Sequence, residues 1–297
     1  MVPRSVGAAT DMTLLASDRA GHGEPLLLLH GIGSTRDDFS ALLPRLAEHF
    51  DVLSVDLPGH GESPVGTWPP TVAALTDAVE ADLDARGLER VHVLGNSLGA
   101  RIGIELAVRH RTRSVVALSP SGLGLPTERV HQGILMATAR TLTRTLRPLL
   151  GTLASTPAGR TSLLAGMRAR PWEASEREAL AMRGGFADST GFWSMLWWAV
   201  LQDVPSGLHR VDSPVMLAQG AVDMVGAGQT PRYLALIPGS RFQLLPGAGH
   251  APQSDSSDAI IALVRETVER AMALTPDRTP DRTPDRTPDR TPVRTSA

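Results

Sequence analysis

The sequence of 297 residues contains no cysteine and no lysine. The absence of cysteine excludes disulfide bonds, zinc sites built from thiolates and a cysteine nucleophile. No uninterrupted apolar stretch approaches the length of about 20 residues that a membrane-spanning helix needs. Residues 1–10 also lack the apolar segment of a classical secretory signal. We therefore expect a cytoplasmic protein without a membrane partner.

Positive and negative charges nearly balance. The 29 basic residues are all arginines and stand against 31 acidic residues, which gives a formal net charge of −2 at pH 7. A hydrophobic fraction of 42% is that of an ordinary globular protein. The charge balance indicates no nucleic-acid partner, and the length accommodates one large α/β domain or two small ones. The sequence does not indicate the oligomeric state.

Strand and helix patterns alternate along most of the chain. Apolar runs that read as buried parallel strands are separated by amphipathic helical patterns, and this alternation is typical of a mostly parallel sheet with helices on both faces. An edge strand is expected at residues 12–16. The runs lie at residues 25–29, 52–55, 91–94, 115–118, 214–218 and 242–245, and the helical patterns lie at residues 34–46, 71–87, 100–110, from about 231, and 254–273.

The alternation pauses between residues 122 and 204, where the signals are helical. One helix or a bent pair is expected at residues 130–150, and a helix at residues 188–204. Ser175 with Glu178 has the spacing of a capping box that opens another. An insertion at this point of a parallel sheet would fold over the carboxyl ends of the strands, where ligands bind. We therefore predict an α/β core at residues 9–121 and 205–273 with a helical cap at residues 122–204.

The end of the sequence is a tandem repeat. Four copies of Thr-Pro-Asp-Arg run from Thr275 to Arg290 and are followed by a degenerate copy. Proline in every unit and the absence of large apolar side chains prevent a helix or a packed core. We predict that residues 274–297 form a disordered tail, which we interpret as a neutral repeat expansion.

One pentapeptide organises the predicted sheet: Gly95-Asn96-Ser97-Leu98-Gly99. A buried strand leads into it and a helix follows it at once, so its central serine must adopt strained backbone geometry while the flanking glycines allow a close approach. Such a serine stands exposed at a helix N-terminus, where developing negative charge is favoured. The pattern predicts that Ser97 is a nucleophile.

A serine hydroxyl needs a base, and the base needs a group that orients it. Asp223 follows the strand expected at residues 214–218, and His250 follows the strand expected at residues 242–245. Both therefore stand at the same sheet edge as Ser97. Asp203 is a rival for the acid, but it falls in the predicted cap rather than at a strand end.

With these motifs in order, the sequence resembles the α/β-hydrolase fold superfamily in its capped serine-hydrolase form, similar to carboxylesterases. The matching stretches, which span residues from about 24 to 273, are His30-Gly31, Asp56-Leu57-Pro58-Gly59-His60-Gly61-Glu62-Ser63, Gly95–Gly99, Gly220–Asp223 and Gly249-His250.

The resemblance implies roles for individual residues. Ser97 is the implied nucleophile, His250 the general base and acid, and Asp223 the orienting carboxylate, with backbone N–H groups of Ile32 and Leu98 as the oxyanion hole. It also implies a small-molecule substrate with no cofactor and no metal. By the same resemblance His30 is interpreted as a residue that holds loops together, and Asp56 and His60 are interpreted as turn and packing residues.

An aromatic cluster at residues 192–198 offers candidates for the substrate pocket. Trp193 and Trp197, together with Met136, are predicted to line an apolar pocket under the cap, although the cluster could equally pack the cap onto the core. Trp172, Met167 and Met182 are further candidates of the same kind.

The reaction follows from the nucleophile type and the flanking residues. Dehalogenases and epoxide hydrolases of this fold use an aspartate where Ser97 stands, and are disfavoured. The pentapeptide Gly95–Gly99 resembles that of carbon–carbon bond hydrolases that act on ring-cleavage products. Those enzymes, however, place a tryptophan directly after the catalytic histidine, where this sequence has Ala251. We therefore predict hydrolysis of a carboxylic ester. One alternative is carbon–carbon hydrolysis, which would need groups such as Arg140, Arg144 or Arg168 near the substrate. Another is acyl transfer or thioester cleavage. A non-catalytic ligand-binding role is disfavoured because all three triad residues are present.

Overall fold

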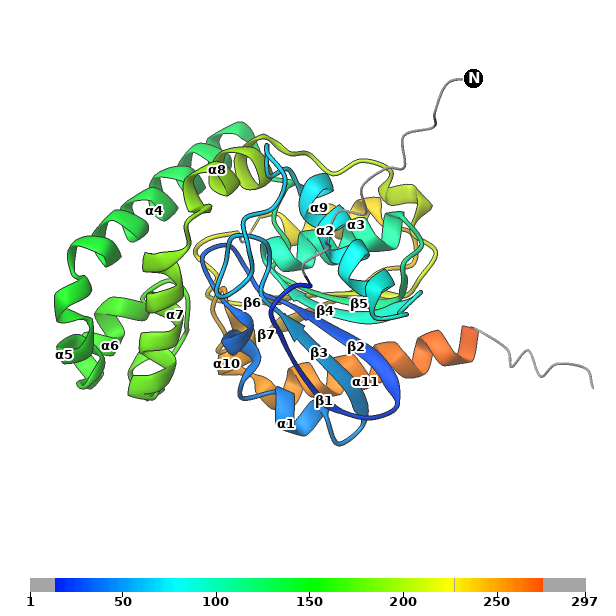
Figure 1. The fold of residues 1–297 in the computed structure, drawn as a ribbon, viewed down its shortest axis with the longest axis horizontal. Helices are drawn as coiled ribbons and strands as arrows, with labels where there is room; N and C mark the ends of the chain where they lie inside the picture. The colour runs from blue at the N-terminus through cyan, green and yellow to red at the C-terminus, as the bar shows by residue number, and fades with distance from the viewer. Residues whose placement is uncertain (1–13, 227, 275–297) are drawn as a thin grey trace, which may run out of the picture.

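The computed structural model describes residues 14–226 and 228–274. Its centre is a seven-stranded sheet with the strand order β1-β3-β2-β4-β5-β6-β7, parallel except for β1, which pairs antiparallel with β3 (Figure 1). The predicted fold class is thereby confirmed. The strands are β1 (Ser17–Gly21), β2 (Glu24–Leu29), β3 (Phe50–Val55), β4 (Val91–Asn96), β5 (Thr112–Leu118), β6 (Val215–Gly220) and β7 (Arg241–Leu245).

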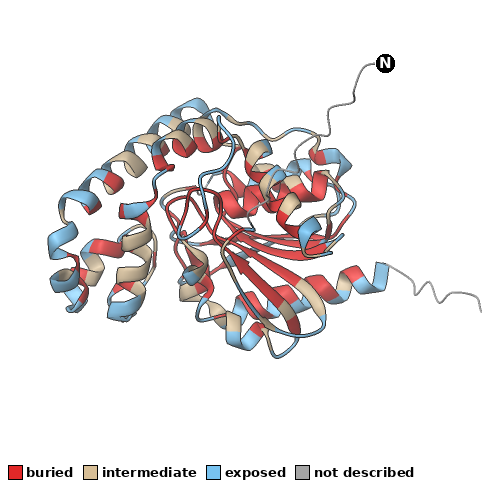
Figure 2. Cartoon of the chain, in the orientation of Figure 1, coloured by how far each residue is buried: buried red, intermediate tan, exposed pale blue. Residues whose placement is uncertain are grey.

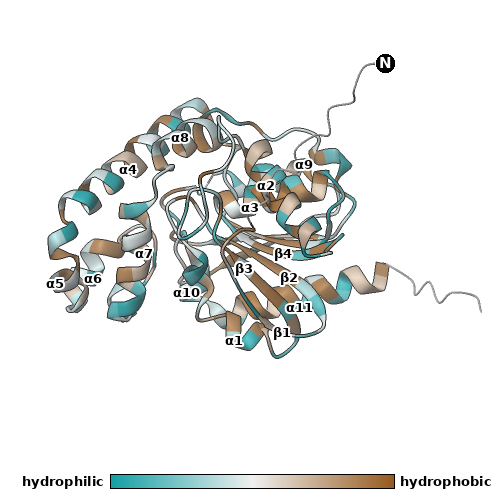
Figure 3. Cartoon of the chain, in the orientation of Figure 1, coloured by the Kyte–Doolittle hydropathy of each residue, from teal (hydrophilic) through white to brown (hydrophobic). Residues whose placement is uncertain are grey.

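The apolar runs form two layers across the sheet. On one face Leu28 pairs with Leu94, which pairs with Val116, which pairs with Met216, all within one buried cluster. The other face carries the neighbouring residues Leu27, Val93, Val115 and Val215 in a second cluster. Burial on both faces explains why these strands read as continuous rather than alternating apolar runs. Figure 2 shows the central strands β2 to β6 largely buried, and Figure 3 shows them as mostly hydrophobic, whereas the edge strands β1 and β7 are more exposed.

Helices cover both faces of the sheet. The helices α2 (Val72–Ala85) and α3 (Leu98–Val108) pack on the face that carries Leu27 and Val93. The opposite face is covered by α11 (Ser257–Leu274) and by the short η1 (Arg36–Phe39) and α1 (Leu43–Leu46). The Thr71 side chain caps α2 by accepting a hydrogen bond of 3.2 Å from the Ala74 N–H. The remaining elements outside the insertion are η5 (Leu208–Arg210), α9 (Thr230–Leu236) and α10 (Pro252–Asp255).

The helices from α4 to η4 belong to one insertion between β5 and β6, which Figure 1 shows grouped at one side of the sheet. It contains a small apolar cluster of its own, which includes Leu150, Leu163 and Leu164. The predicted capping box is present, because Ser175 and Glu178 bond reciprocally at the start of α7. The elements are α4 (Pro126–Thr145), η2 (Arg147–Leu149), α5 (Leu150–Ala154), α6 (Pro157–Leu164), η3 (Pro171–Glu173), α7 (Glu176–Asp188), α8 (Phe192–Met195) and the π-helix η4 (Leu196–Gln202).

Several predicted boundaries are wrong. The single helix expected at residues 34–46 is two short helices, and Ser34 does not cap the first, which is preceded by Thr35 without a side-chain cap. Of the two forms expected at residues 130–150, the bent one agrees with the structure: α4 ends at Thr145, and the break lies near Pro148, which lacks the N–H that would continue the helix. The helix expected at residues 188–204 becomes α8 and η4.

The predictions for the two ends of the chain fall largely outside the described residues. The edge strand expected at residues 12–16 lies instead at β1, and its first residues fall outside the described range. The predicted tail also lies outside the described residues, apart from Leu274 at the end of α11. Among the helices that the structure describes, none is long and apolar enough to cross a membrane.

Candidate active site

Ser97 occupies a sharp turn between β4 and α3. Its backbone φ is 53°, a left-handed conformation that costs a non-glycine residue about 1–3 kcal/mol. A Cβ on Gly95 would overlap the Gly99 carbonyl, and a Cβ on Gly99 would overlap the carbonyl of Leu29 in the neighbouring strand β2. Both glycines of the pentapeptide are therefore required by close backbone packing, as the sequence predicts.

His250 and Asp223 lie side by side at the ends of β7 and β6. The His250 Nδ1 atom is 3.0 Å from Asp223 Oδ1 and 3.1 Å from Oδ2. Asp223 Oδ1 also accepts hydrogen bonds from the N–H groups of Val225 (2.8 Å) and Gly226 (3.0 Å). A carboxylate held in this way can fix the imidazole with its Nδ1–H toward the acid, which leaves Nε2 free to accept a proton.

The surroundings keep Asp223 ionised. Burial alone would raise its pKa, but the His250 ring and the N–H groups of Gly226 and Val225 outweigh burial and lower the pKa to about 2. The carboxylate can therefore stabilise a positive charge that forms on His250 without taking up the proton itself.

Asp203, the rival acid, is engaged elsewhere. Its Oδ1 accepts a hydrogen bond of 3.2 Å from the guanidinium of Arg101, a buried side chain on α3 that also bonds Glu105. The structure therefore brings His250 to Asp223 rather than to Asp203.

Asn96, which the sequence analysis assigned no role, ties the serine turn to the histidine loop. Its Nδ2 donates to the backbone carbonyl of His250 at 2.9 Å and lies 3.4 Å from the Leu118 carbonyl. Asn96 directly precedes Ser97, so this bond fixes the distance between the two segments that carry the predicted nucleophile and base. The amide directly before Ser97 in the pentapeptide was the available sequence signal.

The N–H groups predicted to form the oxyanion hole come from two loops. Leu98 is the first residue of α3, where an N–H has no intrahelical partner, and Ile32 lies in the loop after β2. Within the described part of the chain neither N–H donates a backbone hydrogen bond. Gly31, next to Ile32, approaches Ser97 so closely that a Cβ there would lie 3.3 Å from the serine Cβ.

Two buried histidines hold the loop that carries Ile32. His30 Nε2 accepts the Leu57 N–H and His60 Nε2 accepts the Gly33 N–H, each at 2.9 Å, while their Nδ1 atoms face the carbonyls of Gly31 and Pro58. The rings contact edge to face, with centroids 5.1 Å apart. Burial lowers the pKa of His30 to about 4 and that of His60 to about 3, so both are neutral at pH 7. This geometry agrees with the structural interpretation of both residues, and it gives His60, interpreted from the sequence as a turn and packing residue, a loop-holding role as well.

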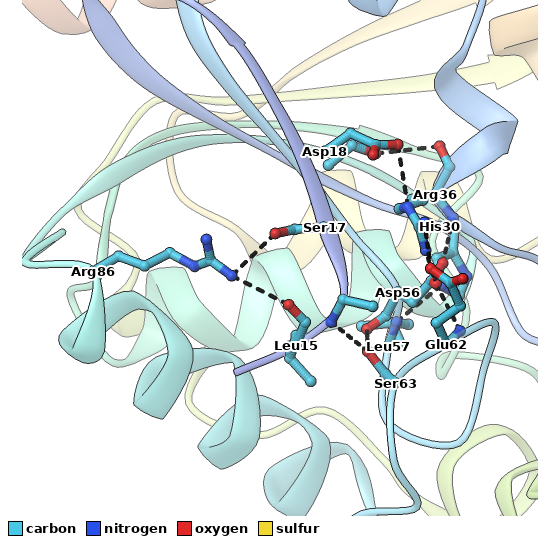
Figure 4. Close-up of polar contacts among 12 residues, drawn as sticks. Leu15, Ser17, Asp18, His30, Arg36, Asp56, Leu57, Glu62, Ser63 and Arg86 are labelled. Carbon is cyan, nitrogen blue, oxygen red and sulfur yellow. Dashed lines mark hydrogen bonds and ion pairs between the residues drawn. The ribbon is translucent and has the colours of Figure 1, made fainter. Parts of the chain in front are cut away.

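Asp56 performs a similar task on the other side of the loop (Figure 4). Its fully buried carboxylate accepts the N–H of Arg36 (2.8 Å) and of Glu62 (3.0 Å) and pairs with the Arg36 guanidinium. The Asp56 carbonyl accepts the Ser63 hydroxyl at 2.7 Å. The loops after β2 and β3 are thus locked together behind Ile32.

Ser97 and His250 open into one cavity of about 290 Å³. Met136, Met167 and Met182, all named as pocket candidates, line it, but Trp193, Trp197 and Trp172 do not. Those tryptophans are 49%, 55% and 49% exposed, so the prediction that Trp193 and Trp197 form the pocket is wrong for this cavity. They lie on the outer side of the insertion, while the apolar lining also includes Ile32, Leu135, Phe186 and Met224.

Two charged side chains line this cavity besides His250: Asp38 and Arg183. Burial raises the pKa of Asp38 to about 6, and it lowers the pKa of Arg183 to about 10. The sequence analysis missed both. For Arg183 a signal existed, because it falls in step with the apolar residues Ala179, Met182 and Phe186 on one face of α7.

Comparisons with known proteins agree with this architecture. Residues 26–263 match the alpha/beta hydrolase family. A pimeloyl-(acyl-carrier protein) methyl ester esterase of Neisseria meningitidis serogroup B is 29% identical over 250 residues, which cover 82% of this chain and 92% of that protein.

Solved structures of similar fold include a hydrolase from Pseudomonas aeruginosa PA01 (TM-score 0.66, 26% identity, covering 86% of this chain and 94% of that one). An esterase from Rhodococcus sp. ECU1013 has a TM-score of 0.68 at 20% identity, covering 86% and 97% of the two chains, and shows the fold alone. The family match covers most of the sheet, the serine turn and both strand ends that carry Asp223 and His250. The chain therefore belongs to the alpha/beta hydrolase family.

Proposed function

We propose that this protein is a serine hydrolase that cleaves a carboxylic ester of a small, largely apolar molecule. The observation that carries the proposal is that Ser97 and His250 line one cavity while the Asp223 carboxylate bonds Nδ1 of the His250 ring. A nucleophile, a base and a group that orients the base are the parts that acyl transfer to serine requires.

In the proposed reaction Ser97 attacks the acyl carbon while His250 Nε2 takes the hydroxyl proton. His250 then gives this proton to the departing alkoxide, and an acyl group remains on Ser97. A water molecule, deprotonated by His250, attacks the acyl carbon in the second half. The carboxylic acid leaves and the proton returns to Ser97.

The N–H groups of Ile32 and Leu98 are the proposed oxyanion hole. Donors that point at the developing negative charge stabilise the tetrahedral intermediate by about 3–4 kcal/mol each. The unusual number of bonds that hold the Ile32 loop, from His30, His60 and Asp56, supports this role, since such donors act through being fixed before the reaction begins.

Two observations support the proposed substrate. Most of the side chains that line the cavity are apolar, with four methionines among them, and such a lining suits an apolar acyl chain. The Neisseria meningitidis relative bears the name of a methyl ester esterase. The predicted cap role of the insertion, the small-molecule substrate and the cytoplasmic location remain parts of this proposal.

Carbon–carbon bond hydrolysis is the weaker candidate. The sequence analysis expected it to use Arg140, Arg144 or Arg168, but none of the three lines the catalytic cavity. Arg140 donates to the Ser189 carbonyl at 2.7 Å, and Arg168 pairs with Asp255. Acyl transfer differs from hydrolysis only in the acceptor, so it is distinguished by experiment.

The test uses p-nitrophenyl esters of increasing acyl length with the wild-type protein and with Ser97→Ala. We expect hydrolysis by the wild type and a loss of at least about a thousandfold in the variant. Addition of alcohols or thiols to the assay separates transfer from hydrolysis by the products that form. Turnover that persists in Ser97→Ala would contradict the proposal.

A further inference from the structure

Four arginines of the described chain are buried, and three have evident partners. Arg101 pairs with Glu105 and Asp203, and Arg168 pairs with Asp255. Arg140 donates to a backbone carbonyl and stacks on the Phe192 ring at 5.1 Å. A buried guanidinium needs such partners because the transfer of an unpaired charge out of water is costly.

Arg183 is the exception. It is 8% exposed, its Nε is buried without a hydrogen-bond partner, and no hydrogen bond or ion pair joins it to any other described residue. Its contact in the protein is the ring of Phe186, whose centroid lies 5.7 Å from the guanidinium carbon. An aromatic face attracts a cation but supplies no negative charge.

The surroundings of Arg183 are those of the proposed reaction site. Its side chain lines the catalytic cavity together with Ser97 and His250. Phe186, one turn further along α7, packs so closely on the loop after β2 that a Cβ on Gly33 would overlap its ring. Residues three apart on a helix are neighbours on its surface, so Arg183 lies beside the loop that carries Ile32.

Asp38 does not neutralise this cation directly. It lines the same cavity from η1, but no ion pair within 4.0 Å joins it to Arg183. Arg183 also lines a second cavity, together with Leu142 and Leu163. Its guanidinium therefore lies in largely apolar surroundings, with donors that protein groups leave unused. A planar fork of this kind matches a carboxylate, which can accept two parallel N–H bonds from it.

We propose that Arg183 binds a carboxylate of the substrate, so that the preferred substrates are esters that carry a second, ionised carboxyl group, such as half-esters of dicarboxylic acids. The carboxylate pairs with the guanidinium while the ester carbonyl reaches Ser97. This inference rests on the proposed ester hydrolysis for its reaction, and on the unpaired cation in the cavity for its specificity.

The first test compares mono-p-nitrophenyl glutarate with neutral p-nitrophenyl pentanoate, an ester of similar length. The preference, measured as the ratio of kcat/KM for the two esters, does not depend on the fraction of folded protein. We expect the wild type to prefer the anionic ester and Arg183→Met to lower the preference by about 10- to 100-fold, mainly through KM. Arg183→Lys should restore part of it, since it keeps the charge without the fork.

Two further variants check the assignment. Arg177→Met removes the same charge from an exposed position on the same helix and should leave the preference unchanged. Asp38→Asn should increase the preference for the anionic ester, because it removes a negative charge that repels the ester's carboxylate. A preference that is equal in wild type and Arg183→Met, or that disappears in Asp38→Asn, would overturn the inference.

A binding measurement separates this inference from the proposed hydrolysis. Calorimetric titration of Ser97→Ala with monomethyl glutarate should show binding that is lost when Arg183→Met is added. If no ester is hydrolysed by the wild type but this binding is found, the hydrolysis proposal fails and the anion site stands. If esters are hydrolysed but monomethyl glutarate binds equally with and without Arg183, the anion site fails and the hydrolase stands.

Discussion

The buried Asp56 and Asp223 at the sheet edge differ from the buried Arg140 and Arg183 of the helical insertion in how many of their polar atoms have partners. At the sheet edge, the carboxylates of Asp56 and Asp223 each have several hydrogen-bond donors, and Asn96 spans two loops. In the insertion, Arg140 has two nitrogens without partners and Arg183 has no polar partner among the described residues. The insertion also exposes Ile134 and other large apolar side chains, whereas the central strands β2 to β6 are largely buried (Figure 2).

This difference separates two tasks. Asp223, whose geometry must stay fixed during the proposed reaction, and Asp56, which holds the loops after β2 and β3, each have several donors, because misplacement is costly there. Groups that select a substrate can keep unused donors for it. We infer that the sheet edge sets the chemistry and that the insertion sets the specificity.

The largest expected effect is on the sheet side of the comparison. Asp223→Asn should lower kcat for p-nitrophenyl esters by about 10⁴-fold, because the amide favours the wrong tautomer of His250 and cannot stabilise its cation. Asp203→Asn is the matched control, since Asp203 pairs with Arg101 instead. Equal losses in the two variants would contradict the assignment of the acid.

The second prediction compares one glycine from each region. Gly99→Ala should destabilise the protein by about 3 kcal/mol or more, because its Cβ would overlap the Leu29 backbone. Gly184→Ala, in α7 with open space around the position, should stabilise it by about 0.5–1 kcal/mol. Denaturant unfolding measures both, and a Gly99→Ala variant as stable as the wild type would refute the packing argument.

The same contrast explains what the sequence could predict. The serine turn, Asp223 and His250 follow strands whose continuous apolar runs are easy to recognise, and a parallel sheet brings its strand ends together whatever the loops do. The role of His30 in holding loops was predictable from the family resemblance, whereas Asp56 was predicted as a turn and packing residue and its bonds to Arg36 and Glu62 were not.

The insertion was less predictable because its side chains obey competing demands. Trp193 and Trp197 fall at helical spacing, but a periodic pattern does not say which face of a helix meets the cavity, and both turn outward. The break near Pro148 and the π-helix after Met195 shift the register of the following residues. Arg183 becomes conspicuous only when its lack of partners is seen.

The third prediction concerns acid. His60 has a folded pKa of about 3 against an ordinary value of 6.5, so its contribution to stability is present above pH 6.5 and is lost as the pH falls toward 3. Between about pH 7 and pH 4, the free energy of unfolding of the wild type should decrease by on the order of 1–3 kcal/mol more than that of His60→Gln. Parallel curves for the two proteins would show that His60 is not buried in its neutral form.

The smallest effects are expected within the insertion. Met136→Ala enlarges the cavity and should change the preferred acyl length of p-nitrophenyl esters, with several-fold changes in kcat/KM. Trp197→Ala, at an exposed position outside the cavity, should change kcat/KM by less than about twofold. A larger change in kcat/KM for Trp197→Ala than for Met136→Ala would show that Trp197 contacts the substrate and that the assignment of the pocket is wrong.

The central claim, that Ser97 is the nucleophile of this cavity, is tested most directly by covalent labelling. The wild-type protein is treated with a fluorophosphonate, and the modified residue is identified by peptide mass spectrometry. The account predicts stoichiometric labelling of Ser97, with labelling strongly slowed in His250→Ala. A label on another serine, or none on Ser97 in folded protein, would contradict it.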